Sequence, residues 1–410
     1  ARERGVVAMS TGPLDGVRVL DLTSMISGPV ATMMLADQGA DVIKVEPLSG
    51  DLVRQMGPNR GGLTATFISS NRSKRSLAVD LKTREGMALL ERLIPTADVF
   101  VQNFRPGAID RMGLSEARVR ALRDDIVYVS ISGFGESGPY AHKRVYDPVI
   151  QALSGLAAIQ ADRDTGRPRM IRTIIPDKTT AVTAAQAITA ALFARERSGR
   201  GQHVKLAMLD TMVAYLWPEG MTGLTFLGKE VKAARAQIAQ DLIFATQDGF
   251  ITAGVVSDDE WRGLCRALER EAWLADERFS TPTGRLIHVV ERLAMTAEVL
   301  ATRTSAEWLA RLDRENVPCA PVLDREQVIA QEQVRVNEVM EELEHPLAGR
   351  YRQPRPAARF SETPARIRSH APMLGEHSAE IAREIGLSGA EVEALFKTKV
   401  LGSPPEPPTR

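Results

Sequence analysis

Short apolar segments that alternate with helix-like segments between residues 17 and 135 place the strongest constraint on how this chain folds. Strands separated by helices at this spacing form a parallel sheet with helices on both faces. The sequence therefore predicts the α/β class, with a large Rossmann-like domain. The expected strands are Val17–Leu22, Asp41–Val45, Asp98–Gln102 and Ile126–Ile131, and the expected helices are Pro29–Gln38, Arg84–Ile94 and Leu114–Leu122.

The rest of the chain indicates a second, smaller domain. After a polar loop at Ala161–Arg172, a long helix is expected from near Asp177 to Arg197, where a basic last turn precedes Gly199. An amphipathic stretch follows at Val204–Leu216, and beyond it short strand-like runs lead into helices that carry tryptophans. We predict that residues 1–220 form the large domain with a linker, 221–330 a smaller α/β domain, 331–401 a segment returning to complete the large domain, and 402–410 a Pro-rich, disordered tail.

The charge balance and the cysteine count disfavour several kinds of partner and site. Lys+Arg and Asp+Glu are equal at 52 each among 410 residues, so no net field favours nucleic acid or an anionic membrane. The most apolar stretch, Ala181–Ala194, is interrupted by polar residues and is shorter than the ~20 residues of a membrane span. Cys265 and Cys319 form neither a disulfide framework nor a metal-ligand pattern. We expect a cytoplasmic protein without a metal site, a nucleic-acid partner or a membrane partner.

One glycine motif, Gly133-Phe-Gly-Glu-Ser-Gly138, has the spacing of a dinucleotide-binding loop. Such a loop must open directly into a helix, whose N-terminus holds the pyrophosphate. Here Pro139-Tyr140 follows without helical periodicity, and the motif comes after the fourth expected strand rather than the first. A nicotinamide cofactor is therefore disfavoured. The absence of a phosphate-loop lysine motif, a zinc-spaced Cys/His set and a Gly-x-Ser-x-Gly sequence disfavours most kinases, metallohydrolases and serine hydrolases.

Asp177, which follows Pro176 at the start of the long predicted helix, has two compatible interpretations. As an N-cap, its side chain would accept a first-turn N–H and contribute about 1 kcal/mol. As a nucleophile it must be ionised, and the positive potential of a helix N-terminus favours the carboxylate. Position alone favours the cap.

Basic residues placed after expected strand ends form a further candidate group. In an open parallel sheet, ligands bind beyond the carboxyl ends of the strands, where basic side chains can pair with phosphates. A solvated charged surface is the alternative interpretation for each of them. The group comprises Lys74, Arg75, Lys82, Arg105, Arg111 and Arg144.

Several longer patterns occur in a fixed order along the chain. They are Pro13-Leu-Asp-Gly-Val-Arg-Val-Leu-Asp-Leu22, Gly28-Pro29, Leu35-Ala-Asp-Gln-Gly-Ala-Asp-Val-Ile-Lys-Val-Glu46, Asn71-Arg-Ser-Lys-Arg-Ser76, Asp80-Leu-Lys82, Asn103-Phe-Arg-Pro-Gly-Ala-Ile-Asp-Arg-Met-Gly113, Ser198-Gly-Arg-Gly-Gln202, Cys319-Ala-Pro-Val322 and Leu374-Gly-Glu-His377. With these patterns the chain resembles, over nearly its whole length, the family III CoA-transferases, which include formyl-CoA transferase and carnitine CoA-transferase, along with α-methylacyl-CoA racemase.

The resemblance implies an enzyme that moves CoA from an acyl-CoA to a free carboxylic acid. It implies two domains with two long connecting segments, in an interlocked homodimer whose active site lies between the large domain of one chain and the small domain of the other. The family's nucleophilic aspartate falls on Asp177, which would form an aspartyl–acyl anhydride and then an aspartyl–CoA thioester. CoA and acyl-CoA would be substrates rather than permanently bound cofactors, and small carboxylic acids would be the other partners.

The family's CoA contacts carry over by position in the same way. Basic members of the set would pair with phosphates, and apolar members would offer surface to adenine or pantetheine. The set is Ile26, Ser27, Val79, Lys82, Asn103, Phe104, Arg105, Arg111, Met112, Arg144, Tyr146 and Asp147, with Lys82, Arg105, Arg111 and Arg144 expected at phosphates and Val79, Phe104 and Met112 at apolar parts.

Departures from the family pattern favour one of the family's activities over the others. In the racemase branch a histidine precedes the aspartate of the segment that here reads Arg144-Val-Tyr-Asp147, so Tyr146 takes its place. A tyrosine with a pKa of about 10 exchanges an α-proton poorly at neutral pH, which favours a transferase. The glycine-rich loop of the formyl-CoA transferase branch is missing and Pro47 replaces a CoA-contacting arginine, so the acid substrates stay open. A 2-methylacyl-CoA racemase and a non-catalytic CoA-binding protein stay as alternatives.

Overall fold

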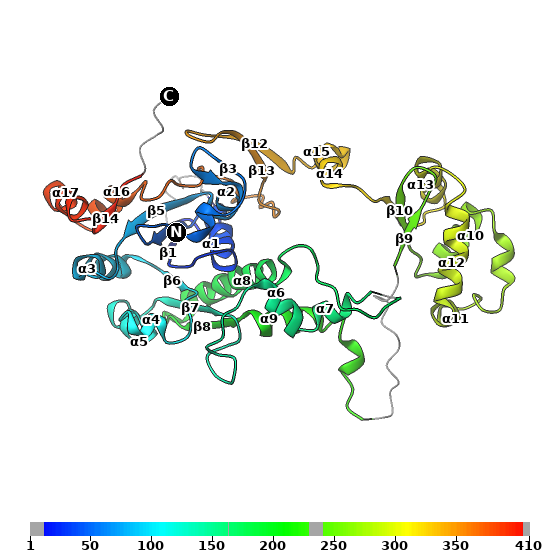
Figure 1. The fold of residues 1–410 in the computed structure, drawn as a ribbon, viewed down its shortest axis with the longest axis horizontal. Helices are drawn as coiled ribbons and strands as arrows, with labels where there is room; N and C mark the ends of the chain where they lie inside the picture. Colours follow the sequence, from blue (N-terminus) through cyan, green and yellow to red (C-terminus); the bar gives the residue numbers. More distant parts are fainter. Residues whose placement is uncertain (1–11, 163, 229–240, 405–410) are drawn as a thin grey trace, which may run out of the picture. The chain divides into compact units, whose positions relative to one another are not determined.

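The computed structural model describes residues 12–162, 164–228 and 241–404 (Figure 1). It divides into two compact units. The large unit holds the chain up to Met221 and again from Glu338, and the small unit holds Thr222–Asn337. From the sequence, the boundaries between the units were expected at residues 220 and 330. In the structure the second crossing comes after two short helices, α14 (Arg325–Ala330) and α15 (Glu332–Val336).

The large unit is built on a seven-stranded sheet with the order β14-β5-β2-β1-β6-β7-β8. All neighbouring strands are parallel except β14, which runs antiparallel to β5. The structure therefore confirms the predicted α/β class with a mostly parallel sheet. The strands are β1 (Arg18–Asp21), β2 (Asp41–Glu46), β5 (Lys74–Val79), β6 (Val99–Gln102), β7 (Val127–Ser132), β8 (His203–Ala207) and β14 (Leu401–Gly402).

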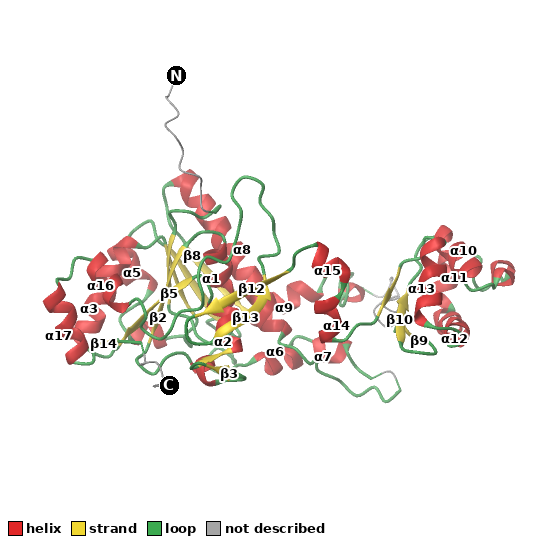
Figure 2. Ribbon diagram, turned by 90° about the horizontal axis from the view of Figure 1, so that it is seen from above, coloured by secondary structure: helices red, strands yellow, loops and turns green. Residues whose placement is uncertain are grey.

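Helices cover both faces of this sheet because successive strand residues point to opposite sides. Leu20 of β1 packs in a core with α3 (Arg84–Leu93), α5 (Glu116–Leu122), α16 (Ser378–Glu384) and α17 (Gly389–Lys397). Val19 packs on the opposite face with α1 (Ser27–Asp37) and α8 (Ile175–Ser198). Figure 2 shows these two sets of helices on either side of the strands. Alanines on the buried face of α8, such as Ala184, allow its close packing against α1.

Three segments differ from the sequence-based expectations. Lys74 and Arg75, expected after a strand end, lie inside β5, and this strand was not predicted. The stretch Val204–Leu216 is not one amphipathic element, because its first part belongs to β8 and the rest forms α9 (Met208–Leu216). Gly402, expected in the disordered tail, lies in β14 and pairs with Ala78. Residues 405–410 lie outside the described residues.

The return segment ties the end of the chain to the large sheet. A hairpin of β12 (Met340–His345) and β13 (Gly349–Pro354) comes first, and α16, α17 and β14 follow. The backbone N–H of Ser76 donates to Nδ1 of His377 at 3.2 Å, and the Ser76 hydroxyl accepts the N–H of Gly375 at 2.9 Å. These bonds hold the return segment against β5. Shorter elements of the large unit are β3 (Asn59–Arg60), β4 (Leu63–Thr64), α2 (Ala65–Asn71), α4 (Ala108–Arg111), α6 (Asp147–Leu153) and α7 (Leu156–Ile159).

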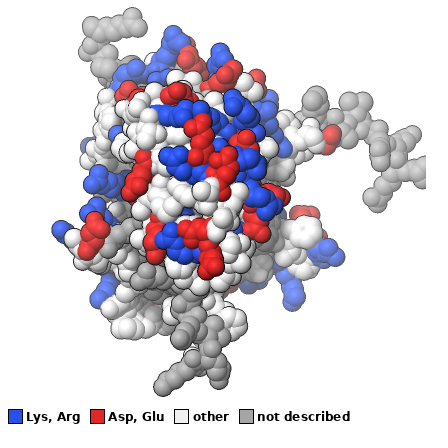
Figure 3. Space-filling view, turned by 90° about the vertical axis from the view of Figure 1, so that its right-hand side faces the viewer, with Lys and Arg blue, Asp and Glu red and all other residues white. Residues whose placement is uncertain are grey.

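The small unit has its own core beneath a three-stranded antiparallel sheet. Trp261 and Trp308 are buried there, at 3% and 1% exposure, together with Phe279. Lysine and arginine side chains are interspersed with acidic ones on the surface shown in Figure 3. Arg266 and Glu315 form one ion pair of this unit. The elements are β9 (Ile243–Ala245), β10 (Phe250–Ala253), α10 (Asp258–Ala267), α11 (Pro282–Ile287), α12 (Val289–Leu300), α13 (Ser305–Arg314) and β11 (Cys319–Pro321).

None of the helices in the described part of the chain combines the length and the apolar character needed to cross a lipid bilayer.

Candidate active site

A cavity of about 240 Å³ opens at the carboxyl ends of the central strands. The chain runs from β1 outward through β2 to β5 and then returns to β6, so β1 and β6 are neighbours at the switch point of the sheet. Ligands of open α/β sheets bind at this place because the loops on either side diverge. The cavity is lined by Ser24, Met25, Ser27, Asn103, Phe104, Arg105, Pro106, Ile131, Ser132, Gly133, Ala141, Lys143, Arg144, Val145, Tyr146, Asp177 and Met208.

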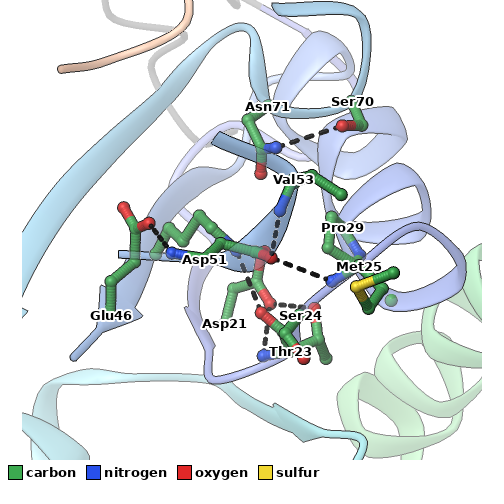
Figure 4. Close-up of polar contacts among 12 residues, drawn as sticks. Asp21, Thr23, Ser24, Met25, Pro29, Glu46, Asp51, Val53, Ser70 and Asn71 are labelled. Carbon is green, nitrogen blue, oxygen red and sulfur yellow. Dashed lines mark hydrogen bonds and ion pairs between the residues drawn. The ribbon is translucent and has the colours of Figure 1, made fainter. Parts of the chain in front are cut away.

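The turn after β1 is fixed by a buried network of charged groups beneath the cavity (Figure 4). The ammonium of Lys74 lies 2.9 Å from Asp21, and that of Lys44 lies 3.0 Å from Asp51. Lys44 also donates to the carbonyl of Thr23 at 2.9 Å. Burial alone would raise the pKa of Asp21, but Lys74 and Lys44 outweigh it and hold that pKa well below its ordinary value.

Asp51 reaches the cavity wall directly, because it accepts the backbone N–H of Met25 at 3.2 Å (Figure 4). Met25 has φ of 69°, in the left-handed region that a side chain rarely occupies. Gly28 is also required here, since a Cβ at this position would lie 2.3 Å from Cβ of Thr23. The buried network therefore holds a strained turn that places Ser24, Met25 and Ser27 at the cavity.

The turns after β1 and β6 are joined across the switch point by one reciprocal pair of hydrogen bonds. Ser24 donates its N–H to the Asn103 amide oxygen at 3.0 Å, and the Asn103 amide donates to the Ser24 carbonyl at 2.9 Å. The next residue, Phe104, donates its N–H to the Gln102 side chain at 2.8 Å. Asn103, Phe104 and Arg105 are thereby presented on one wall.

Asp177 is in the first turn of α8, at its third residue, and not at the cap position. The N-cap prediction is therefore wrong: Ile174 takes that place and offers no capping side chain. Burial and, next, the nearby charge of Asp147 raise the pKa of Asp177, hydrogen bonds from Ser27 lower it in part, and together they bring it to about 6. The helix end was expected to keep the carboxylate ionised. A pKa of about 6, raised chiefly by burial, still leaves it mostly ionised at neutral pH.

Three cations share the cavity with this carboxylate. Arg105, Lys143 and Arg144 are exposed, and within the described residues none of them forms an ion pair. The Lys143 ammonium lies 3.6 Å from the ring centroid of Tyr140. Among the described residues that line the cavity, Asp177 is the only acid. The cavity thus carries an excess of positive charge suited to an anionic ligand.

The predicted binding residues fall into two groups. Seven predicted residues line the cavity, namely Ser27, Asn103, Phe104, Arg105, Arg144, Tyr146 and Asp177. Asp147 is buried beside Asp177, whose N–H it accepts at 3.3 Å. Outside the lining, the side chain of Val79 is 1% exposed in the core, Met112 packs against the same core, Ile26 packs under the turn after β1, and Lys82 and Arg111 are exposed.

Lys74 and Arg75 are not free for phosphates. The Lys74 ammonium forms a buried ion pair with Asp21 inside the sheet. Arg75 forms ion pairs with Asp41, Glu380 and Glu384. Both residues are structural, and their placement among phosphate ligands is wrong.

Among the lining residues that were not predicted, Lys143 and Gly133 are two that the sequence could have indicated. Lys143 directly precedes Arg144, so the argument that singled out basic residues after strand ends applies to it equally. Gly133, whose motif was set aside as a dinucleotide loop, does line the cavity. A Cβ at Gly133 would lie 2.6 Å from a side-chain carbon of Val145. The missing side chain therefore allows the backbone at Gly133, just after β7, to pack closely against Val145.

Fold and site together define an α/β protein of the Rossmann-like kind, with a carboxylate among cations at the switch point of its sheet. Residues 14–378 match the family model described as CoA-transferase family III. The chain belongs to this family, and its activity is that of a CoA-transferase.

Relatives and solved structures agree with that assignment. The chain is 36% identical to the succinate–glutarate CoA-transferase of Agrobacterium fabrum, over 91% of this chain and 96% of the relative. It is 33% identical to the formyl-CoA:oxalate CoA-transferase of an Escherichia coli O6:H1 strain, over 94% and 99%. Among solved structures, a CAIB/BAIF family protein from Brucella suis has a TM-score of 0.79 at 32% identity, with 92% of this chain and 100% of that chain covered. Rv3272 from Mycobacterium tuberculosis has a TM-score of 0.80 at 30% identity, with 90% and 99% covered.

Proposed function

We propose that this chain transfers CoA from an acyl-CoA to a free carboxylic acid through covalent intermediates on Asp177. The observation that carries the proposal is the placement of this carboxylate as the only acid among the described lining residues of a cation-rich cavity. A carboxylate nucleophile must be ionised, and a pKa of about 6 meets that need at neutral pH while keeping the group more basic than an ordinary aspartate.

The chemistry proceeds in two symmetrical halves. The Asp177 carboxylate attacks the acyl-CoA thioester, the C–S bond breaks, and an aspartyl–acyl anhydride and CoA thiolate result. The thiolate attacks the aspartyl carbonyl, which releases the first acid and leaves an aspartyl–CoA thioester. The acceptor carboxylate then attacks this thioester, and the returning thiolate takes the new acyl group from the second anhydride and frees Asp177. Each tetrahedral oxyanion needs N–H donors, and first-turn backbone groups of α1, where Ser27 lines the cavity, are the candidates.

For CoA itself we propose the contacts carried over from the family. Arg105 and Arg144 line the cavity, and Lys82 and Arg111 are exposed, so all four remain candidates for phosphates. Val79 and Met112, whose side chains pack in or against the core, could meet the ligand mainly through backbone or edge atoms. No permanently bound cofactor enters the proposed scheme.

We propose the interlocked homodimer as the working assembly. Its support within the large unit is exposed apolar side chains on α8 and α9. Phe193 of α8 is 64% exposed and Tyr215 of α9 is 60% exposed. A partner chain would remove these apolar side chains from water. Two free cysteines remain the basis for proposing the cytoplasm as its compartment.

For the acids we propose dicarboxylates. One carboxylate of such an acid takes part in the exchange at Asp177. The second carboxylate needs a cationic side chain that is not already paired with a phosphate of CoA. Lys143 supplies one, because its ammonium is held at the cavity over the ring of Tyr140. The relatives named for succinate, glutarate and oxalate act on acids of this class.

The test of the nucleophile is a comparison of Asp177→Ala with Asp210→Ala. Asp210 is an exposed acid in the first turn of α9, so it matches Asp177 in helix position but lies outside the cavity. We expect Asp177→Ala to lose CoA exchange by a factor of at least about 10⁴, and Asp210→Ala to keep the wild-type rate. Near-wild-type exchange by Asp177→Ala would refute the proposal.

The test of the acid class uses glutarate and pentanoate, which differ by one carboxylate at equal chain length. We expect Lys143→Ala to raise the KM for glutarate about tenfold and to leave that for pentanoate unchanged. Lys397→Ala, on the exposed face of α17, is the control. Equal effects of Lys143→Ala on both acids would contradict a dicarboxylate site.

A further inference from the structure

Helix α8 begins without a capping side chain of its own, and a second helix supplies one. Its first N–H groups can be followed one by one. Ile175 donates to the Thr173 carbonyl at 3.0 Å, Pro176 has no N–H, and Lys178 donates to the Ile174 carbonyl at 3.2 Å. The N–H of Asp177 donates to Oδ2 of Asp147 at 3.3 Å. Asp147, at the start of α6, therefore acts as a cap from outside the helix.

Gln151 fixes that cap. It lies one turn after Asp147 on α6, is 2% exposed, and donates its Nε2 to Asp147 Oδ1 at 2.7 Å. Its Oε1 accepts the N–H of Ile171 at 3.0 Å. Because an N–H can only donate, this contact fixes the orientation of the amide and turns Nε2 toward acceptors.

The same amide holds the segment that leads into α8. Nε2 of Gln151 also faces the carbonyls of Ile171 at 3.3 Å and Thr173 at 3.2 Å. Thr173 is followed two residues later by the first residue of α8. One buried side chain thus holds both supports of Asp177: the approach segment from one side and the Asp147 carboxylate from the other.

We propose that Gln151 is the positioning residue that aims the Asp177 carboxylate into the cavity; this inference rests on the proposed function. Gln151 is not among the lining residues of the cavity, and it acts through Asp147 and the segment at 171–173. The groups that face the Asp177 carboxylate are Asp147 and Ser27. A released Asp147 could turn its second oxygen toward Asp177 and leave the first-turn N–H without an acceptor. The attack geometry and the ionisation of the nucleophile would then change together.

The test compares two substitutions of Gln151 with one matched control. Gln151→Met keeps the length of the side chain and removes all its hydrogen bonds. Gln151→Glu keeps the acceptor for Ile171, and it can donate to Asp147 only while protonated. Gln353→Met is the control, because Gln353 is a similarly buried glutamine (4% exposed) of β13 that does not line the cavity.

We expect Gln151→Met to lower kcat about 10- to 100-fold with little change in the KM for acyl-CoA, since misplacement of a reacting group acts on the chemical step. The pH midpoint of its rate should also move away from that of the wild type. For Gln151→Glu, the rate relative to wild type should rise about tenfold or more from about pH 8 to about pH 6, as protonation restores the donor to Asp147. Gln353→Met should match the wild type in kcat and in pH midpoint.

A wild-type kcat and pH midpoint in Gln151→Met would overturn the inference. If this variant does not fold, a pH-independent ratio of Gln151→Glu to wild type overturns it instead. Different outcomes refute the inference about Gln151 and the proposed function of Asp177. Full exchange by Asp177→Ala would refute the covalent route itself, whereas an inactive Asp177→Ala beside a fully active Gln151→Met would refute only the role of Gln151.

Discussion

The raised pKa of Asp177 predicts that its removal stabilises the protein while abolishing activity. The pKa rises from an ordinary 3.8 to about 6 in the fold, chiefly through burial. The folded state therefore binds the proton more tightly than the unfolded chain, and stability is lost as the pH rises through this window. Asp177→Asn has no charge to bury and escapes that loss.

The magnitude follows from the two pKa values. Each pH unit between them corresponds to about 1.4 kcal/mol, so the ionised carboxylate costs about 3 kcal/mol at pH 8. Partial solvent contact and the changed hydrogen bonds of an amide reduce what can be recovered, and we expect about 2 kcal/mol of added stability. About half of the difference should remain at pH 5, where the wild-type carboxyl is already largely protonated in the fold.

Urea unfolding at both pH values, followed by circular dichroism, measures this difference. Asp210→Asn serves as the control, because it removes a first-turn acid from α9 that is exposed. An Asp177→Asn variant that is no more stable than the wild type at pH 8 would refute the reasoning. A gain in stability that is the same at both pH values would refute it as well, because the effect would then not arise from ionisation.

Three further results are expected. Lys74→Met strands the buried Asp21 carboxylate and should lower the free energy of unfolding by about 3–5 kcal/mol in urea titrations, whereas a loss below about 1 kcal/mol would show that Asp21 is readily neutralised. Gly28→Ala brings a methyl group against Thr23 and should cost about 1–3 kcal/mol in thermal unfolding and lower kcat by displacing the cavity turn; an unchanged melting temperature would contradict the clash. The transfer rate should fall as the pH drops through about 6, since only ionised Asp177 attacks, and a rate that is flat down to about pH 5 would argue against this carboxylate as nucleophile.

The periodic parts of the fold were predictable because their side-chain patterns are local. β1, β2, β6 and β7 are short runs of buried apolar residues, and each was placed within one or two residues of its bounds. β5 was not predicted because it begins with two charged residues, Lys74 and Arg75. Their charges are neutralised in the fold by Asp21 and by acids of β2 and α16. When the partner of a charged residue lies far away in the sequence, the sequence pattern indicates an exposed residue although the side chain is buried.

Part of the cavity lining was predictable, but the supports of the site were not. Resemblance to a family points to Asp177 by position, and the structure puts this residue in the cavity lining, whereas the cap on its N–H comes from Asp147 and is itself fixed by Gln151. No local pattern connects residues 147, 151 and 177, since the contact exists only after α6 packs beside the start of α8. The raised pKa is likewise a property of burial among distant residues, which the local helix-end argument did not include.

The central claim is that Asp177 becomes covalently acylated during transfer, and the fate of one oxygen atom tests it most directly. With an acceptor acid labelled with ¹⁸O, the bridging oxygen of the second anhydride comes from that acid and stays on the enzyme when thiolate removes the acyl group. Mass spectrometry of the peptide that contains Asp177, after turnover, should therefore find ¹⁸O in its side-chain carboxylate. An unlabelled Asp177 after complete conversion of the acceptor to its CoA thioester would contradict the account.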